Sequence, residues 1–405
     1  ASRPQPRQLV MRDILFRGWC SEADFARGTH LGTTVRDGCL VIAAEGAGTR
    51  VYADPHGDRA PVTYTHATWL SPEMRPGFAF NDLIPSWNAS TPAGTWLEVE
   101  VRAGTDGVHM SRWYTLGRWA ETDQDIHPTS VPGQDDEVAS VAFDILSARE
   151  TSTLTSYQLR ISLLRKAGSD ATPSVRLAGM MSSHVPSGAP EHTSPVGVAR
   201  GKVLDVPAYS QQVHRGEYPQ WDNGGESWCS PTSTSMLLGY WGAGPSEADY
   251  AWVDPDLQDR WIDFAARHTF DHNYGGAGNW SFNTAYAARY GMTAFVTRLR
   301  SLTEAEEFIA AGIPLVVTVS FTKDQLDGAG YDTEGHLLTI IGFDDAGNVV
   351  SNDPASHEIP SNDAVRTTYD RAQFERVWLG SAGGVTYVIH PPGVVLPERP
   401  TQPNW

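Results

Sequence analysis

Alternating apolar and polar residues mark the first half of the chain. The segments Trp96–Arg102 and Tyr157–Leu163 each place apolar residues at every second position. A period of two is typical of a β-strand with one face in a core. Further strand-sized segments lie between turns rich in Gly, Pro and Asp: Cys39–Ala44, Val108–Leu116, Val138–Leu146 and Ser174–Met181. With no long helical period in this half, the pattern predicts an antiparallel β-sandwich over residues 1–185.

The pattern changes after residues 186–202, whose Ser-, Gly-, Pro-, His- and Thr-rich composition predicts a linker. Thr303 and Glu306 have the spacing of a helix capping box, and Gly312 and Pro314 follow where that helix should end. Four strands are predicted later in the chain: Leu315–Phe321, His336–Phe343, Asn348–Asp353 and Val385–His390. We therefore predict an α+β domain over residues 203–395, with a tail over residues 396–405.

The composition argues against some classes of binding partner. The chain has 405 residues, with 30 Lys and Arg against 48 Asp and Glu, which gives a net charge of −18. Such an acidic surface repels phosphate backbones and anionic lipid, so a nucleic-acid partner is not expected. The apolar runs are shorter than the ~20 residues that span a bilayer, so membrane insertion is not expected either. We expect a monomer.

Three cysteines occur in the sequence: Cys20, Cys39 and Cys229. In an oxidising compartment, Cys20 and Cys39 would form one disulfide and leave Cys229 as a thiol. The chain also starts at Ala1 rather than at Met, as a processed, exported protein would. We therefore predict a secreted protein, the alternative being a cytosolic protein with three reduced thiols.

Cys229 lies in a segment suited to nucleophilic chemistry. Gly224 and Gly225 permit a tight loop before it, and Pro231 suits the first turn of a helix. A cysteine at a helix N-terminus is favoured as the thiolate, although many free cysteines are simply buried apolar residues.

His336 begins a predicted strand that a short turn joins to the strand ending near Asp353. A connection with an even number of residues would place Asp353 on the same face as His336, whereas an odd number would place Asn352 there. Either side chain could orient an imidazole that takes the proton of the Cys229 thiol. This combination is the one that acyl transfer through a thioester needs.

The segments Val206–Gln211, Trp228–Met236, Gly335–His336 and Asn352–Ala355 resemble the peptidase C39-like family of papain-fold cysteine peptidases, over about residues 203–392. The resemblance implies a papain-like fold, with Cys229 as nucleophile, His336 as general base and Asp353 as orienting group. It also implies that Gln211 is the oxyanion-hole donor beside the Cys229 N–H. Related papain enzymes use Asn for orientation, which keeps Asn352 as an alternative.

Two features depart from the family's pattern. Ser230 stands where a Gly commonly follows the nucleophile. An inserted loop, His214–Glu226, separates Gln211 from Cys229 and must fold back, and Gln212 is an adjacent alternative donor.

Aromatic residues supply candidate binding surfaces. Trp228 and a Gly-rich loop with Tyr274, Asn279 and Trp280 could contact the substrate, although the loop could equally be a structural Ω-loop. In the predicted sandwich, four rings could stack on sugars of a cell wall or glycan, or could fill the core: Trp87, Trp113, Tyr114 and Trp119.

The sequence thus predicts a cysteine peptidase that forms a Cys229 thioester, with no metal or organic cofactor. A transamidase or deamidase using the same site is one alternative. The other is a non-catalytic protein that binds a cell wall or glycan.

Overall fold

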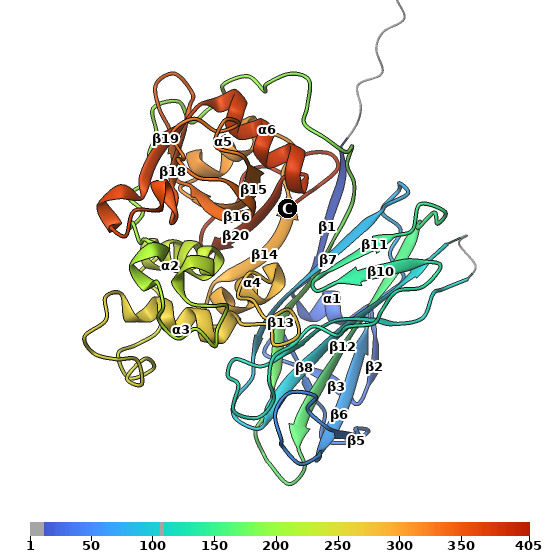
Figure 1. The fold of residues 1–405 in the computed structure, drawn as a ribbon. Coiled ribbons are helices and arrows are strands. Elements are labelled where there is room, and N and C mark those ends of the chain that lie inside the picture. Colours follow the sequence, from blue (N-terminus) through green and yellow to red (C-terminus); the bar gives the residue numbers. More distant parts are fainter. Residues whose placement is uncertain (1–11, 106–108) are drawn as a thin grey trace, which may run out of the picture.

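The computed structural model describes residues 12–105 and 109–405 and places them in two sheet-rich domains (Figure 1). The chain start that entered the secretion prediction, and Val108 of one predicted strand, lie outside these residues. Among the described helices, none combines the length and apolar character needed to cross a membrane.

Two antiparallel sheets form the N-terminal domain, with a short helix α1 (Glu22–Ala26) between its first strands. The larger sheet has seven strands: β1 (Asp13–Trp19), β3 (Thr33–Arg36), β4 (Cys39–Ile42), β7 (Asp82–Ser90), β10 (Ala139–Ala142), β11 (Ile145–Ala148) and β13 (Ser174–His184). The smaller sheet has six: β2 (Thr29–Leu31), β5 (Gly48–Tyr52), β6 (Val62–Leu70), β8 (Thr95–Gly104), β9 (Tyr114–Trp119) and β12 (Ser156–Lys166).

The C-terminal domain begins with helical elements and continues with two small antiparallel sheets. Its α-helices are α2 (Cys229–Tyr240), α3 (Arg260–Thr269), α4 (Trp280–Ala288), α5 (Leu302–Ala310) and α6 (Arg371–Ala382). Its 3₁₀ turns are η1 (Gln211–His214), η2 (Gly225–Ser227), η3 (Ser356–Glu358) and η4 (Asn362–Ala364). One sheet has the order β14 (Thr293–Arg298), β20 (Val385–His390), β15 (Leu315–Phe321), β16 (Thr333–Ile340), and the other the order β17 (Gly342–Phe343), β18 (Val349–Asn352), β19 (Arg366–Tyr369).

Three of the predicted strands differ in the structure, and one of them, His336–Phe343, is divided between β16 and β17. Val138–Leu146 is not one strand but most of the hairpin β10–β11, in which Ala142 pairs with Ile145. Phe143 lies in that turn with a φ of 58°, in the left-handed region. The strand predicted from Val108 begins only at Tyr114.

The C-terminal domain packs against the outer face of strand β7. The side chain of Asn88 donates to the carbonyl of Ala294 at 2.7 Å and accepts from its N–H at 3.1 Å, and Ser86 accepts from the N–H of Val296 at 2.8 Å. These alternate residues of β7 therefore satisfy backbone groups of β14, the edge strand of the C-terminal sheet. β7 is buried on both faces as a result.

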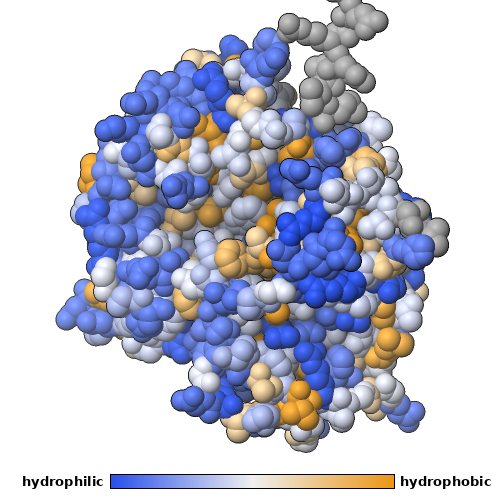
Figure 2. All heavy atoms as spheres, turned by 45° about the vertical axis from the view of Figure 1, so that its right-hand side comes forward, coloured by the Kyte–Doolittle hydropathy of each residue, from blue (hydrophilic) through white to orange (hydrophobic). Residues whose placement is uncertain are grey.

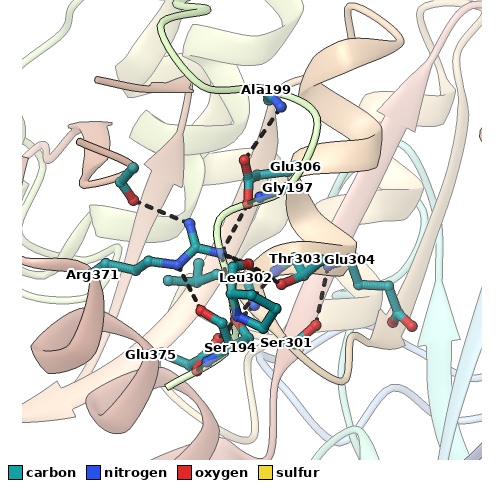
Figure 3. A network of polar contacts seen from close by, with 12 residues as sticks. Ser194, Gly197, Ala199, Ser301, Leu302, Thr303, Glu304, Glu306, Arg371 and Glu375 are labelled. Atoms are coloured by element: carbon teal, nitrogen blue, oxygen red, sulfur yellow. Dashed lines mark hydrogen bonds and ion pairs between the residues drawn. The ribbon is translucent and has the colours of Figure 1, made fainter. Parts of the chain in front are cut away.

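The predicted linker is held against the C-terminal domain by buried charges (Figure 3). Glu306 accepts hydrogen bonds from the N–H groups of Gly197 at 2.7 Å and Ala199 at 3.2 Å, and pairs with Arg371 at 2.8 Å. Glu306 is therefore not in the predicted capping box. Helix α5 is instead capped by Ser301, whose hydroxyl accepts from the N–H of Glu304.

The predicted Cys20–Cys39 disulfide is not formed, and both residues are free cysteines. Each thiol faces its own loop. The Cys20 sulfur lies 4.0 Å from a carboxylate oxygen of Asp24, and the Cys39 sulfur lies 3.7 Å from the carbonyl of Asp37. The prediction of secretion therefore loses the support of a disulfide and stays a prediction.

Three of the four sandwich aromatics are core residues, because Trp87, Tyr114 and Trp119 are fully buried. Trp113 is half-buried, and the guanidinium groups of Arg102 and Arg160 lie 4.7 and 4.1 Å from its ring centre. The structure therefore supports the core alternative for three of the four rings and leaves no stacking surface made of all four.

The tail predicted over residues 396–405 is packed rather than extended. The Trp405 ring is buried 4.9 Å from that of Phe308, and the Phe16 N–H donates to the Pro403 carbonyl. The tail thus lies against both β1 and α5.

Candidate active site

Cys229 is the first residue of helix α2 and lies in the wall of a cleft of about 960 Å³ between the two domains. Trp228 precedes it as the N-cap and gives no side-chain cap. The first N–H groups of a helix have no partner within the helix, and their dipoles favour a negative charge at this end. The position therefore suits a thiolate.

His336 and Asp353 lie together behind this cysteine. The Nε2 atom of His336 is 2.8 Å from Oδ1 of Asp353, and both side chains are buried. Burial by itself lowers the pKa of His336, but the charge and hydrogen bond of Asp353, together with the nearby Cys229 side chain, raise that pKa to about 10. The imidazole is thus held as the cation between a carboxylate and a sulfur.

Two tyrosines complete the surroundings of Asp353. The hydroxyls of Tyr331 and Tyr369 donate to its Oδ2 atom at 2.6 and 2.5 Å, and the N–H of Ala355 donates to Oδ1 at 3.0 Å. Burial raises the pKa of Asp353, but His336 and the two hydroxyls outweigh that effect and hold it below its ordinary value. No sequence signal pointed to either tyrosine.

The strand connection that places Asp353 beside His336 differs from the predicted hairpin. Phe343 pairs with Val349 across five connecting residues, an odd number, for which we expected Asn352 beside His336. The ladder, however, is interrupted between β16 and β17, and Asp353 follows the end of β18. Asn352 points away, with its amide donating to the carbonyls of Val206 and Pro207.

The inserted loop folds back, so that η1 and η2 lie together. The Nε2 atom of Gln211 donates to the carbonyl of Glu226 at 2.7 Å, which leaves its second N–H for another acceptor. Gln212 lies in the same cleft wall, and its Oε1 accepts from Arg215 at 2.7 Å. A side chain at Gly225 would overlap the His214 backbone, so the close approach of the two turns requires glycine.

The four residues predicted to contact the substrate divide into two groups. Tyr274 and Trp280 line the cleft. Trp228 does not, because it is fully buried and its ring N–H donates to the Trp221 carbonyl. Asn279 is also buried, where it caps helix α4 and bonds Asp271. Those two predictions are wrong because capping and core packing use the side chains.

The N-terminal domain contributes to the cleft, which the sequence did not predict. Asp82, Ile145 and Ser147, from strands β7 and β11, line its wall. The Phe143 ring lies 4.2 Å from that of Tyr274, and Asp144 accepts from the N–H of Trp280 at 2.5 Å. The β10–β11 hairpin thus holds the aromatic loop of the other domain.

Residues 15–183 match the Peptidase C39 N-terminal domain, and residues 203–385 match the Peptidase_C39 like family. No curated protein matches the sequence.

Three solved structures show remote similarity. One is described as a putative C39-like peptidase from Bacillus anthracis. It is 16% identical with a TM-score of 0.29, and the match covers 46% of this chain and 96% of that one. The second comes from a study of promiscuous carbohydrate-binding modules of the β-sandwich superfamily: 9% identity, TM-score 0.17, 40% of this chain and 55% of that one. The third is the catalytic domain of an endo-1,3-β-glucanase from Thermotoga petrophila: 11% identity, TM-score 0.17, 44% of this chain and 96% of that one.

The family matches confirm the resemblance to the peptidase C39-like family that the sequence motifs indicated, and they suggest a cysteine peptidase. The C-terminal domain, residues 203–385, thus resembles the Peptidase_C39 like family, and residues 15–183 resemble the Peptidase C39 N-terminal domain.

Proposed function

We propose that the protein is a papain-like cysteine peptidase that cleaves peptide or protein substrates through a thioester on Cys229. The observation that carries this proposal is the contact of 2.8 Å between His336 Nε2 and Asp353 Oδ1, with Cys229 and His336 in the lining of the same cleft. A thiolate, an imidazolium and an orienting carboxylate are the groups that this chemistry requires.

In the proposed reaction, the Cys229 thiolate attacks the carbonyl carbon of the scissile amide. The N–H of Cys229 and the free N–H of Gln211 stabilise the resulting oxyanion. His336 gives its proton to the departing amine, and the C–N bond breaks to leave a thioester. Neutral His336 then takes a proton from water, whose oxygen attacks the thioester and releases the acid and the Cys229 thiolate.

Exposed carboxylates around the cleft favour a cationic substrate. Asp332, Glu334 and Glu358 line it and are exposed, as is Glu226, which lies 3.4 Å from Arg215. The guanidinium in its described lining, that of Arg298, pairs with Asp82 at 3.0 Å. Figure 2 shows a mainly hydrophilic face with scattered hydrophobic residues rather than one large apolar patch. We therefore propose that peptides rich in Lys and Arg are preferred.

The N-terminal domain has a structural role in this proposal. Ile145 and Ser147 give it a share of the cleft wall, so it shapes the binding site for the peptide and need not bind a glycan.

The test is cleavage of a broad peptide library by the wild type and by Cys229→Ala, with Cys39→Ala as a matched control. We expect new α-amino groups from the wild type and the control only, mainly from basic peptides, with rates that fall as salt is added. Equal cleavage by Cys229→Ala would contradict the proposal. Ammonia release without new α-amino groups would indicate a deamidase.

A further inference from the structure

Three side chains of types that can bind a metal meet between η1 and helix α3. The Nδ1 atom of His214 lies 2.6 Å from Oε2 of Glu217 and 3.5 Å from Oδ2 of Asp263. The three donor atoms all lie within 4.8 Å of one another. They come from η1, the loop after it and helix α3, so the fold brings together residues that are far apart in the sequence.

The surroundings of Asp263 are unusual for a buried carboxylate. Its side chain is 0% exposed, and neither carboxylate oxygen has a hydrogen-bond partner among the described residues. The nearby guanidinium of Arg260 donates elsewhere, to the carbonyls of Tyr250 and Val253. A buried carboxylate without a partner is costly, and Glu217 adds a second one beside it.

We propose that His214, Glu217 and Asp263 bind one divalent transition-metal cation, best matched by Zn²⁺. A neutral imidazole and two carboxylates balance a charge of +2. Imidazole and carboxylate are ligands that zinc commonly takes, with bonds of about 2.0–2.2 Å. Binding requires the short His214–Glu217 contact to open by only a fraction of an ångström, since ligands at those bond lengths lie roughly 3.3 Å apart.

The site has a structural role in this proposal, separate from the peptide chemistry. His214 and Glu217 lie in the loop that connects Gln211 with Cys229. The ring of His214 packs 5.8 Å from that of Trp228, the residue before the nucleophile. A cation that joins this loop to helix α3 would therefore fix the two turns that place Gln211 beside Cys229.

The experiment uses the full chain with Cys229→Ala, so that zinc cannot bind at the cysteine and His336. Chelator-treated protein is titrated with Zn²⁺ by calorimetry and by thermal unfolding. We expect one ion per chain and a higher Tm. Affinity should fall at least tenfold in Glu217→Gln and in Asp263→Asn, but not in Glu226→Gln, a control in the same loop.

Cobalt provides a readout that does not depend on the folding of the variants. Co²⁺ added to the chain with Cys229→Ala should give the visible absorption of a tetrahedral nitrogen–oxygen site, and Zn²⁺ should displace it. Absence of both stoichiometric Zn²⁺ uptake and this absorption would overturn the proposal, as would a metal-free Asp263→Asn chain with a raised Tm. The latter result would indicate that a shared proton, not a metal, relieves the carboxylate pair.

Discussion

Asp353 has two effects on His336 that can be separated by substitution. It accepts the Nε2 hydrogen bond, and its negative charge raises the pKa of His336 to about 10. A raised pKa keeps the imidazole protonated through neutral pH, so the ion pair with Cys229 should be lost only as pH approaches 10.

Asp353→Asn should keep the hydrogen bond and remove the charge. We predict that the alkaline limb of kcat/KM then moves from near pH 10 to a lower pH, with part of the activity retained. Asp353→Ala removes both effects and should lower kcat on the order of 10²–10⁴-fold. The measurement is a full pH–rate profile, with Asp324→Asn, an exposed residue outside the cleft lining, as the control. An unshifted limb in Asp353→Asn would contradict this account.

Substitution of Tyr369 tests the hydrogen bond that its hydroxyl donates to Asp353. Tyr369→Phe removes a donor to a buried charge and should lower the free energy of unfolding by about 1.5–3 kcal/mol. Tyr240→Phe removes a bond to the neutral carbonyl of Gly312 and should cost only about 0.5–1.5 kcal/mol. Denaturant unfolding measures both, and equal losses would argue against a charged Asp353.

At the scale of elements, the turns η1 and η2 position the ends of the site. Gly225 lies where they touch, and a methyl group there would overlap the His214 backbone and the Gln211 carbonyl. We predict that Gly225→Ala displaces the loop and lowers kcat about 10²-fold. Gly393→Ala, which has no atom within 4 Å of the added carbon, is the control and should keep full activity. Unchanged kcat in Gly225→Ala would show that the loop does not position the site.

The elements that could be predicted are those with local signals. Strands β15 and β20 have the predicted bounds, because a buried run and its flanking turns suffice to define a strand. The partner of His336 could not be derived from the hairpin count, since the break between β16 and β17 depends on tertiary packing. Tyr331, Tyr369 and the wall from the N-terminal domain were missed because nothing local marks a long-range contact.

Both polar and aromatic contacts join the two domains. Asn88 pairs with both backbone groups of Ala294, and the rings of Trp87 and Trp119 lie 6.1 and 5.1 Å from that of Phe282 in the other domain. The two domains thus share one continuous apolar core.

We predict that the two domains unfold together, in one calorimetric transition with equal calorimetric and van't Hoff enthalpies. Asn88→Ala should orphan two buried backbone groups of the edge strand and destabilise the chain by about 1–3 kcal/mol for each. Ser90→Ala, at the exposed end of the same strand, should change little. Two resolved transitions in the wild type would contradict a shared core.

Peptide cleavage by the proposed route depends on a thiolate at Cys229 that is paired with His336. The most direct measurement is iodoacetamide alkylation of the native chain at pH 6, with each cysteine followed by mass spectrometry. Burial raises the pKa values of Cys20 and Cys39, so these internal controls should react slowly. We predict that Cys229 reacts far faster than both, and that His336→Ala removes the difference. Equal rates for the three cysteines in the wild type would show that no ion pair exists.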